Sequence, residues 1–208
     1  MRTLAVFALT LAWTGGSILA APTAPAIPPP TDAAIAWVSK LGGTVETSPD
    51  RPGKPVIKVD LHGTAVQDSD LEALAALPEL ETLDLRLTKI GDAGVAHLRT
   101  LTKLRFLNLF RTGLSDDGLV PLEGMHDLET LLIGGTRVTN SGMSRLAAFK
   151  KLKKLSVFDT QVGDAGLGPL ATLPRLEVLL VGKSKVTDEG KRRIEAARPG
   201  LKFTEPIG

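Results

Sequence analysis

Asp60, His62 and Asp84 are the residues of this chain whose types and spacing come nearest to an enzymatic site. The two aspartates are 24 residues apart. On neighbouring strands their carboxylates would lie about 5 Å apart, the separation of a retaining glycosidase pair, and with Asn108 they could also hold a cation. An open row of strands, however, has no pocket that would raise a carboxyl pKa or exclude water. We therefore expect a solvated acidic stripe beside Arg86 and predict neither a catalytic nor a metal site.

The composition excludes several other kinds of chemistry. The chain contains no cysteine, which rules out disulfides, thiolate metal sites and a cysteine nucleophile. Its net charge of +2 is too small to indicate nucleic-acid binding. The remaining histidines, His97 and His126, are expected at the surface. No cofactor is predicted.

A 24-residue repeat supplies the elements that must position these residues. Its columns begin at Leu80, Leu83, Leu85, Thr88, Ile90, Asp92 and Gly94, and each recurs four more times with residues of the same kind. A degenerate earlier copy of the repeat starts at Val56 and has Asp70 at the glycine position. About six copies at a fixed period predict a solenoid.

Each repeat is predicted to contain one strand and one short helical segment. Leu83 and Leu85 alternate as in a strand with one buried face, and Val95 and Leu98 begin an inward helical stripe. Asp92 stands where this segment starts, and we expect it to cap the helix by accepting from a free backbone N–H. The threonine column is expected to bond loop backbone, and the glycine column to permit close approach.

The row L-x-x-L-x-L-x-x-T-x-[ILV]-x-D-x-G-[LVM]-x-x-L-x-x-[LMF] resembles the leucine-rich repeat over residues 56–199. Its D-x-G-L half is similar to the subtype of F-box substrate receptors and many secreted bacterial proteins, although threonine replaces the usual Asn or Cys. The resemblance implies an α/β solenoid of about six repeats, right-handed, with parallel strands on the concave face and short helices outside. It also implies a binding surface. An adaptor role in ubiquitin ligation is disfavoured, because no F-box-like segment is present.

Three columns of strand side chains point away from the core, onto the concave face. Beyond the second strand they are largely apolar, and exposed apolar clusters often mark contact sites. The predicted binding residues are Arg86, Phe106, Phe110, Leu132, Lys154, Phe158, Val178 and Leu180.

The same pattern allows a second interpretation, in which Phe110 and Phe158 fold over Gly134 and pack on each other. The sequence does not decide between partner contact and lateral packing. Six strands spaced about 4.8 Å apart span only about 24 Å, which is too small for the roughly 800 Å² per partner of an ordinary interface. A protein partner would therefore also use the rims or bind weakly, or the target is a peptide or a glycan.

Charge is distributed unevenly along the repeats. Residues 32–144 have a net charge of −5 and residues 145–208 a net charge of +6. The basic groups of the second part are Lys150, Lys151, Lys153 and Lys154, and Lys191, Arg192 and Arg193. A solvated face explains them simply; the functional alternative is attraction to an anionic envelope polymer, an acidic partner or a membrane surface.

The ends of the chain depart from the repeat. Residues 1–20 resemble a secretory signal peptide, with cleavage expected after Ala20 and an uncleaved anchor as the alternative. We predict a proline-rich linker at 21–31, a helix and hairpin cap at 32–55, and a leucine-rich repeat domain at 56–208 with a C-terminal cap from 191.

The sequence thus predicts an exported protein, periplasmic or secreted, that is not an enzyme and binds a protein or peptide through its concave face. A mature chain without a transmembrane span, and a monomer, are expected. An envelope polymer or glycan binder using the basic C-terminal end is the alternative, and a hydrolase using Asp60 and Asp84 comes third.

Overall fold

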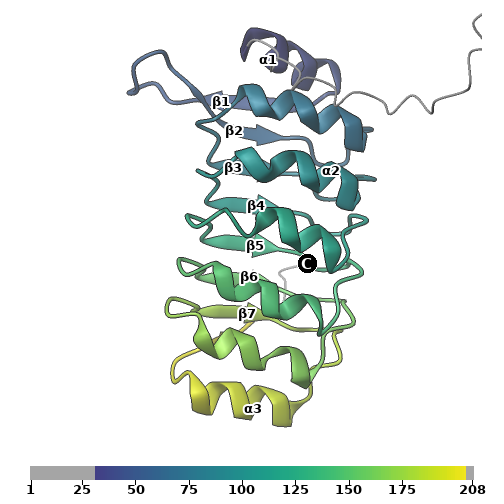
Figure 1. Ribbon diagram of the computed structural model, residues 1–208, viewed down its shortest axis with the longest axis vertical. Coiled ribbons are helices and arrows are strands. Elements are labelled where there is room, and N and C mark those ends of the chain that lie inside the picture. The colour runs from purple at the N-terminus through teal and green to yellow at the C-terminus, as the bar shows by residue number, and fades with distance from the viewer. Residues whose placement is uncertain (1–30, 205–208) are drawn as a thin grey trace, which may run out of the picture.

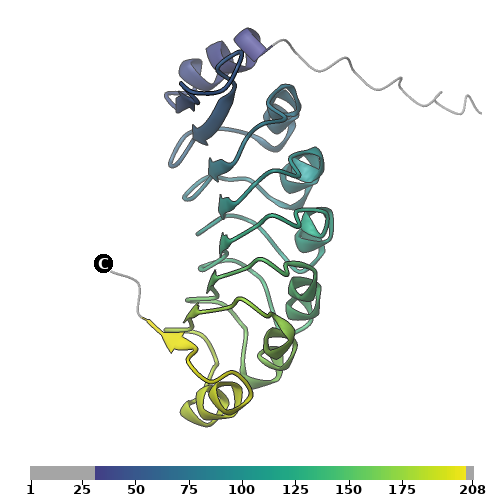
Figure 2. The same cartoon turned by 90° about the vertical axis from the view of Figure 1, so that its left-hand side faces the viewer.

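One curved sheet of eight strands runs the length of the molecule, and short helical segments cover its convex side (Figures 1 and 2). The computed structural model describes residues 31–204, so the predicted signal peptide and most of the linker lie outside the described residues. The strands are β1 (Thr44–Thr47), β2 (Val56–Asp60), β3 (Thr82–Asp84), β4 (Phe106–Asn108), β5 (Thr130–Leu132), β6 (Lys154–Ser156), β7 (Val178–Leu180) and β8 (Lys202–Phe203). They lie side by side in chain order.

Strands β2 to β8 are parallel, and each residue is in register with the residue one repeat further along. Leu83 lies beside Leu107, and Leu107 beside Leu131. Hydrogen bonds continue past the strands into the turns, where for example the N–H of Leu85 donates to the carbonyl of Asn108 over 2.9 Å. The strands of all repeats therefore share one continuous ladder of backbone hydrogen bonds, as their constant period predicts.

The convex side is built mainly from 3₁₀ turns. Its elements are α1 (Thr31–Lys40), η1 (Asp68–Ala76), α2 (Asp92–Ala96), η2 (His97–Thr100), η3 (Asp117–Leu122), η4 (Gly142–Ala148), η5 (Asp164–Gly166), η6 (Gly168–Thr172) and α3 (Asp188–Ala197). Buried residues such as Leu119, Leu122 and Met125 are spaced by three, which matches the three residues per turn of a 3₁₀ helix. In the last repeat Lys191 breaks this spacing, and α3 is a regular α-helix.

The threonine column hydrogen-bonds the turn that follows each strand, as predicted. Every member donates from its hydroxyl to the carbonyl three residues earlier, for example Thr88 to Leu85 at 2.6 Å and Thr112 to Leu109 at 2.8 Å. The hydroxyl of Ser184 does the same with Val181. The residue immediately before each of these hydroxyl donors turns the chain. These residues are Gly63, Leu87, Arg111, Gly135, Asp159 and Lys183, and all have φ between 53° and 67°.

The aspartate column does not cap helices, and that prediction was wrong. Asp92 lies inside α2, whose N-cap is Gly91, and it makes no capping bond. Its carboxylate instead accepts from the N–H of Ser115 over 2.7 Å and from the hydroxyl of Ser115 over 2.5 Å. Asp116 binds Thr139 in the same way. Up to Asp164 each acidic side chain of the column thus bonds the backbone of the next repeat, because in a stack the nearest free N–H groups belong to the neighbour.

The glycine column makes room for these carboxylates. A Cβ on Gly166 would lie 2.7 Å from Oδ1 of Asn140, and one on Gly118 would collide with Oδ1 of Asp92. The close approach expected of this column is therefore real, and it is required between repeats. Aspartate and glycine act as a pair, the first in one repeat and the second in the next.

The two ends of the solenoid differ from its middle. Helix α1 and the antiparallel pair β1–β2 lie at the N-terminal end, where Ala34 and Val38 of α1 are buried. At the other end β8 adds a final parallel strand beside β7. Within residues 31–204 no helix is long and apolar enough to cross a membrane.

Gly118→Ala is expected to lower the free energy of unfolding by about 1–3 kcal/mol, because its new methyl group overlaps the Asp92 carboxylate. Gly124→Ala is the matched control, since no atom lies within 4 Å of a Cβ there. Chemical denaturation monitored by circular dichroism measures both.

A double-mutant cycle tests the pairing itself. Asp92→Ala alone loses two hydrogen bonds and is expected to cost about 1–3 kcal/mol. Combined with Gly118→Ala it should cost less than the sum of the single changes by about 1 kcal/mol, because the carboxylate no longer obstructs the methyl group. Simple additivity would contradict the proposed contact.

Candidate functional site

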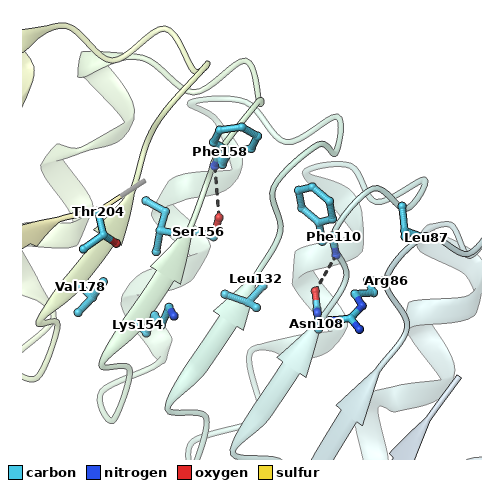
Figure 3. Close-up of a pocket in the computed structure, with 11 residues that line it drawn as sticks. Arg86, Leu87, Asn108, Phe110, Leu132, Lys154, Ser156, Phe158, Val178 and Thr204 are labelled. Carbon is cyan, nitrogen blue, oxygen red and sulfur yellow. Dashed lines mark hydrogen bonds between the residues drawn. The ribbon is translucent and has the colours of Figure 1, made fainter. Parts of the chain in front are cut away.

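A groove opens on the concave face over strands β4 to β8 (Figure 3). Its floor consists of the middle strand side chains and their continuation past β8, which are Asn108, Leu132, Ser156, Leu180 and Thr204. One wall is formed by residues of the turns, Arg86, Leu87, Phe110 and Phe158, and the other by Lys154 and Val178. The groove has a volume of about 890 Å³.

The flat, open face expected from the sequence is therefore wrong for this half of the molecule. The sheet curves, as Figure 2 shows, and the rings of Phe110 and Phe158 rise from the turns beside it (Figure 3). A row of side chains along a curved sheet becomes a hollow when large residues stand along one margin of it.

The groove brings together seven of the eight residues predicted to bind a partner. They are Arg86, Phe110, Leu132, Lys154, Phe158, Val178 and Leu180. Phe106 is half-buried on β4 and does not line the groove. Leu180, expected to be exposed, is buried with 7% of its surface accessible, because β8 continues the sheet beyond β7. The other apolar members are half-buried.

The aromatic wall has a gap in its middle. The ring of Phe110 leans over Gly134, where a Cβ would lie 3.1 Å from its Cδ2 atom, whereas Phe158 approaches Gly134 with its backbone carbonyl. The guanidinium of Arg111 lies 5.3 Å from the centre of the Phe110 ring, and the Lys183 ammonium lies 5.4 Å from that of Phe158. Figure 3 shows the two rings on separate turns, with a space between them.

Polar side chains on the floor accept hydrogen bonds from backbone N–H groups of the turns. The Oδ1 atom of Asn108 accepts from the N–H of Phe110 over 3.1 Å, and Oγ of Ser156 accepts from the N–H of Phe158 over 3.5 Å. Leu132 stands at the equivalent position one repeat before Ser156 and cannot accept. None of the hydrogen bonds found among residues 31–204 has the N–H of Gly134 as its donor.

The two aspartates with possible catalytic roles perform this same structural task. Oδ1 of Asp60 accepts from the N–H of His62 over 3.0 Å and lies 2.8 Å from Nδ1 of its ring. Oδ1 of Asp84 accepts from the N–H of Arg86 over 3.0 Å. Burial acts to raise the pKa of Asp60, but the His62 hydrogen bonds and the charges of His62 and Arg86 outweigh it, so the pKa lies below its ordinary value. A glycosidase acid needs the opposite shift.

Metal binding finds no support in the described part of the chain. Residues 31–204 contain no cluster of three or more His, Asp or Glu side chains placed to hold an ion. Asp84 already contacts the Nδ2 atom of Asn108 over 3.2 Å and the guanidinium of Arg86 over 3.5 Å.

Sequence reasoning missed four residues of the groove, which are Leu87, Asn108, Ser156 and Thr204. Asn108 and Ser156 share a column with Leu132 and were passed over because they are polar. Leu87 is the most unusual of the four. Its side chain is 51% exposed and its φ is 59°, a left-handed conformation that is unfavourable for a branched side chain. Only the position of Leu87 in the turn column could have indicated this.

Charges alternate in sign from repeat to repeat along the side of the solenoid. In one column Glu81, Arg105, Glu129 and Lys153 follow one another, and each neighbouring pair forms a salt bridge or approaches within 3.9 Å. Lys103 pairs with Glu79, and Lys151 with Asp127, in a second column. Like charges would meet if neighbouring repeats carried the same sign, so alternation converts repulsion into attraction.

Salt bridges account for five of the seven residues in the two basic groups predicted near the C-terminal end, all but Lys150 and Lys154. Lys151 and Lys153 bond acids of the preceding repeat, and Arg192 and Arg193 pair with Glu189 inside α3. Within residues 31–204, no carboxylate lies within 4 Å of Lys154, which borders the groove.

Comparison with known proteins agrees with this architecture. A family model described as "Leucine Rich repeat" matches residues 77–98, 100–122 and 150–171. The chain folds as a leucine-rich repeat solenoid. Where the common repeat has asparagine or cysteine, this chain has Thr88 and its column, whose hydroxyls bond the turn carbonyls.

Two solved structures from Listeria monocytogenes resemble this leucine-rich repeat solenoid. The first is an internalin C2, with 21% sequence identity and a TM-score of 0.57, covering 88% of this chain and 89% of that chain. The second is an internalin (inlF), with 20% identity and a TM-score of 0.55, covering 85% of this chain and 56% of that chain. Curated protein sequences provide no match. At this level of identity the likeness extends to the fold.

Glu129→Gln is expected to make stability less dependent on acid pH. Hydrogen bonds from Lys153 and then Arg105 lower the pKa of Glu129 from 4.5 to about 2. The stabilisation is therefore complete above about pH 5 and is lost as the pH falls from about 4.5 to 2. Denaturation midpoints of wild type and variant should differ near neutral pH and converge near pH 2.

Glu177→Gln is the control for this experiment, because Glu177 occupies the same column without a salt bridge among the described residues. Since Glu129 lies at the surface, the difference at neutral pH should be about 1 kcal/mol or less. A difference that persists unchanged at pH 2 would refute the electrostatic explanation.

Leu87→Gly is expected to raise the free energy of unfolding by about 0.5–1 kcal/mol, because glycine adopts positive φ without strain. Leu87→Ala keeps the strain and removes the same exposed side chain, so it should bring no gain. Thermal unfolding of both variants separates the backbone effect from the loss of the exposed leucine.

Proposed function

We propose that this leucine-rich repeat protein is a non-enzymatic interaction module that holds part of a protein partner in the groove. The observation that carries this proposal is a half-buried groove whose apolar side chains the repeat does not require. The core columns, the threonine turns and the aspartate–glycine pairs all lie elsewhere. Leu87 also leaves half of an apolar residue exposed beside the groove, which favours a role in binding.

The dimensions of the groove favour a short segment of the partner. Pockets of roughly 300–1,000 Å³ usually take small molecules or short chains, and the groove has about 890 Å³. A folded partner would bury about 800 Å² on this side and would need the rims as well. We therefore infer that one extended segment enters the groove and supplies most of the specificity.

The location proposed for this interaction is outside the cytoplasm. Residues 1–20, with a basic residue and then an apolar stretch, have the form of an export signal. On that basis the protein is periplasmic or secreted, and its partner belongs to the cell envelope or to the surroundings of the cell.

The polymer-binding alternative is weakened by the charge pairing. Lys151, Lys153, Arg192 and Arg193 would each have to exchange a carboxylate for the polymer. Lys154 is the cation of that region that borders the groove, and it can contribute to partner binding there.

A capture experiment from envelope extract and culture medium tests the proposal. Residues 21–208 are immobilised as wild type, as the double variant Phe110→Asp with Phe158→Asp, and as Val120→Asp. Val120 is an apolar residue outside the groove that is 43% exposed, so this control adds a carboxylate elsewhere on the surface. Chemical cross-linking and mass spectrometry then identify the captured proteins and the segments in contact.

The expected result is a partner that wild type and Val120→Asp retain and the double variant loses, although all three unfold cooperatively. Because both rings are half-buried, the double variant should lose about 1–3 kcal/mol of stability and still fold. Equal capture by all three proteins would contradict a role for the groove.

A further inference from the structure

The groove has a period of two repeats. On its wall Phe110 and Phe158 stand 48 residues apart, with Gly134 between them, and on its floor Leu132 and Leu180 stand 48 residues apart, with Ser156 between them. The strands are in register. Since parallel strands are spaced by about 4.8 Å, each large apolar residue is followed by another about 9.6 Å along the groove.

This spacing selects one backbone conformation for an extended ligand that lies along the groove. A polyproline II helix has three residues per turn and rises about 3.1 Å per residue, so every third side chain returns to the same face after about 9.3 Å. A β-strand repeats its face after about 6.6–6.8 Å, and an α-helix after about 5.4 Å. Only the polyproline II period matches that of the groove.

The chain contains a segment of this kind outside the described residues. Residues 21–30 read APTAPAIPPP, and Pro22, Pro25 and Pro28 are spaced by three. In a polyproline II helix these three prolines would lie on one face, about 9.3 Å apart. From β4 to β8 the groove crosses four strand spacings, or about 19 Å, which about six residues of such a helix would span.

The length of the segment indicates that it fills the groove of another copy. It ends at Thr31, whose hydroxyl donates to the carbonyl of Ala76 over 3.4 Å on the helix-bearing side of the solenoid. Ten residues reach about 31 Å, and filling the groove uses about 19 Å of that length. The remaining 12 Å or so would have to cross an outer helical layer about 10 Å thick and also run two strand spacings, about 9.6 Å, from the level of β2 to β4. Even the straight line is then about 14 Å, which is longer than the segment allows.

We propose that residues 21–30 of one copy bind as a polyproline II helix in the groove of a second copy. This inference rests on the proposed function of the groove as a peptide site. Prolines of one face pack on Leu132 and Leu180, with the rings of Phe110 and Phe158 alongside. The contact joins the N-terminal segment of one copy to the groove of the next and replaces the expected monomer.

The absence of charge in residues 21–30 is consistent with this arrangement. Lys154 and Arg86 at the margins of the groove do not need to lose their hydration, as they would beneath a buried partner. Binding to the groove is also helped because prolines restrict the free segment, so little conformational freedom is lost.

The first test uses a blocked synthetic peptide of residues 21–30, titrated into residues 21–208 by isothermal calorimetry at a protein concentration below that of self-association. The control peptide has the same composition with its prolines spaced by two and by four. We expect the native peptide to bind, and the control and the protein variant Phe158→Ala each to weaken binding by about tenfold or more. Equal affinity of both peptides, or no binding, overturns the proposal.

The second test measures self-association by sedimentation velocity over a range of protein concentrations. The triple variant Pro22→Ala, Pro25→Ala and Pro28→Ala should remain monomeric, whereas Pro29→Ala with Pro30→Ala should associate like wild type. A wild type that stays monomeric at all concentrations overturns docking between copies.

The failure of this inference is distinguishable from the failure of the proposed function. If the groove variant Phe110→Asp with Phe158→Asp loses a captured partner while the peptide of residues 21–30 does not bind, the groove is a partner site and its occupant is foreign. If capture is insensitive to the groove and the peptide also fails to bind, both proposals are overturned.

Discussion

The side-chain oxygen that one repeat extends to the backbone of the next, from an aspartate or from Asn140, is the contact on which the rest of the structure depends. Asp92 bonds Ser115, Asp116 bonds Thr139, and a glycine in the accepting repeat leaves space for the side chain. A hydrophobic core alone would tolerate sliding between similar surfaces. A directional bond at every interface instead fixes the rotation and the rise of each repeat. The straight columns on the concave face, and therefore the groove, follow from that register.

The same register makes the concave face independent of the core. Core leucines, turn threonines and interlocking aspartates occupy other columns, so residues such as Phe110 and Gly134 are free to differ between repeats. A solenoid of similar repeats acquires a distinct binding site because residues outside the core columns can differ from one repeat to the next. Here it places large residues on alternate repeats, and a hollow with its own period results.

The fold was predictable because the residues that specify each strand and turn recur in every repeat. Columns such as Leu83 and Thr88 occur in every copy, so chance resemblance is averaged out and the ladder and its turns follow directly. The 3₁₀ turns could also have been predicted, since Leu119, Leu122 and Met125 are spaced by three. The same spacing also fits one face of an α-helix, which is the commoner element. The aspartate column was misread because a cap and a bond to the next repeat require the same residue type, and only three-dimensional proximity separates them.

The site was less predictable because it depends on what differs between repeats. Seven of the eight residues chosen for the concave face line the groove, yet its depth arises from curvature and from the orientation of two rings, which no spacing reports. Leu180 is buried because β8 lies beside it, and Leu87 faces the groove because its backbone turns left-handed. Neither the burial of Leu180 nor the direction of Leu87 can be predicted from the type of that residue alone.

The alternation of charge between repeats has a consequence for how such a gene can change. Glu81 and Glu129 are two repeats apart, as are Arg105 and Lys153, and the groove residues Phe110 and Phe158 share that spacing. Deleting or duplicating a single repeat would bring like charges together along the flank and shift the groove out of phase. Removing or inserting two repeats would preserve both. The charges of the flank and the large residues of the groove therefore share a period of two repeats, although the core repeats every 24 residues.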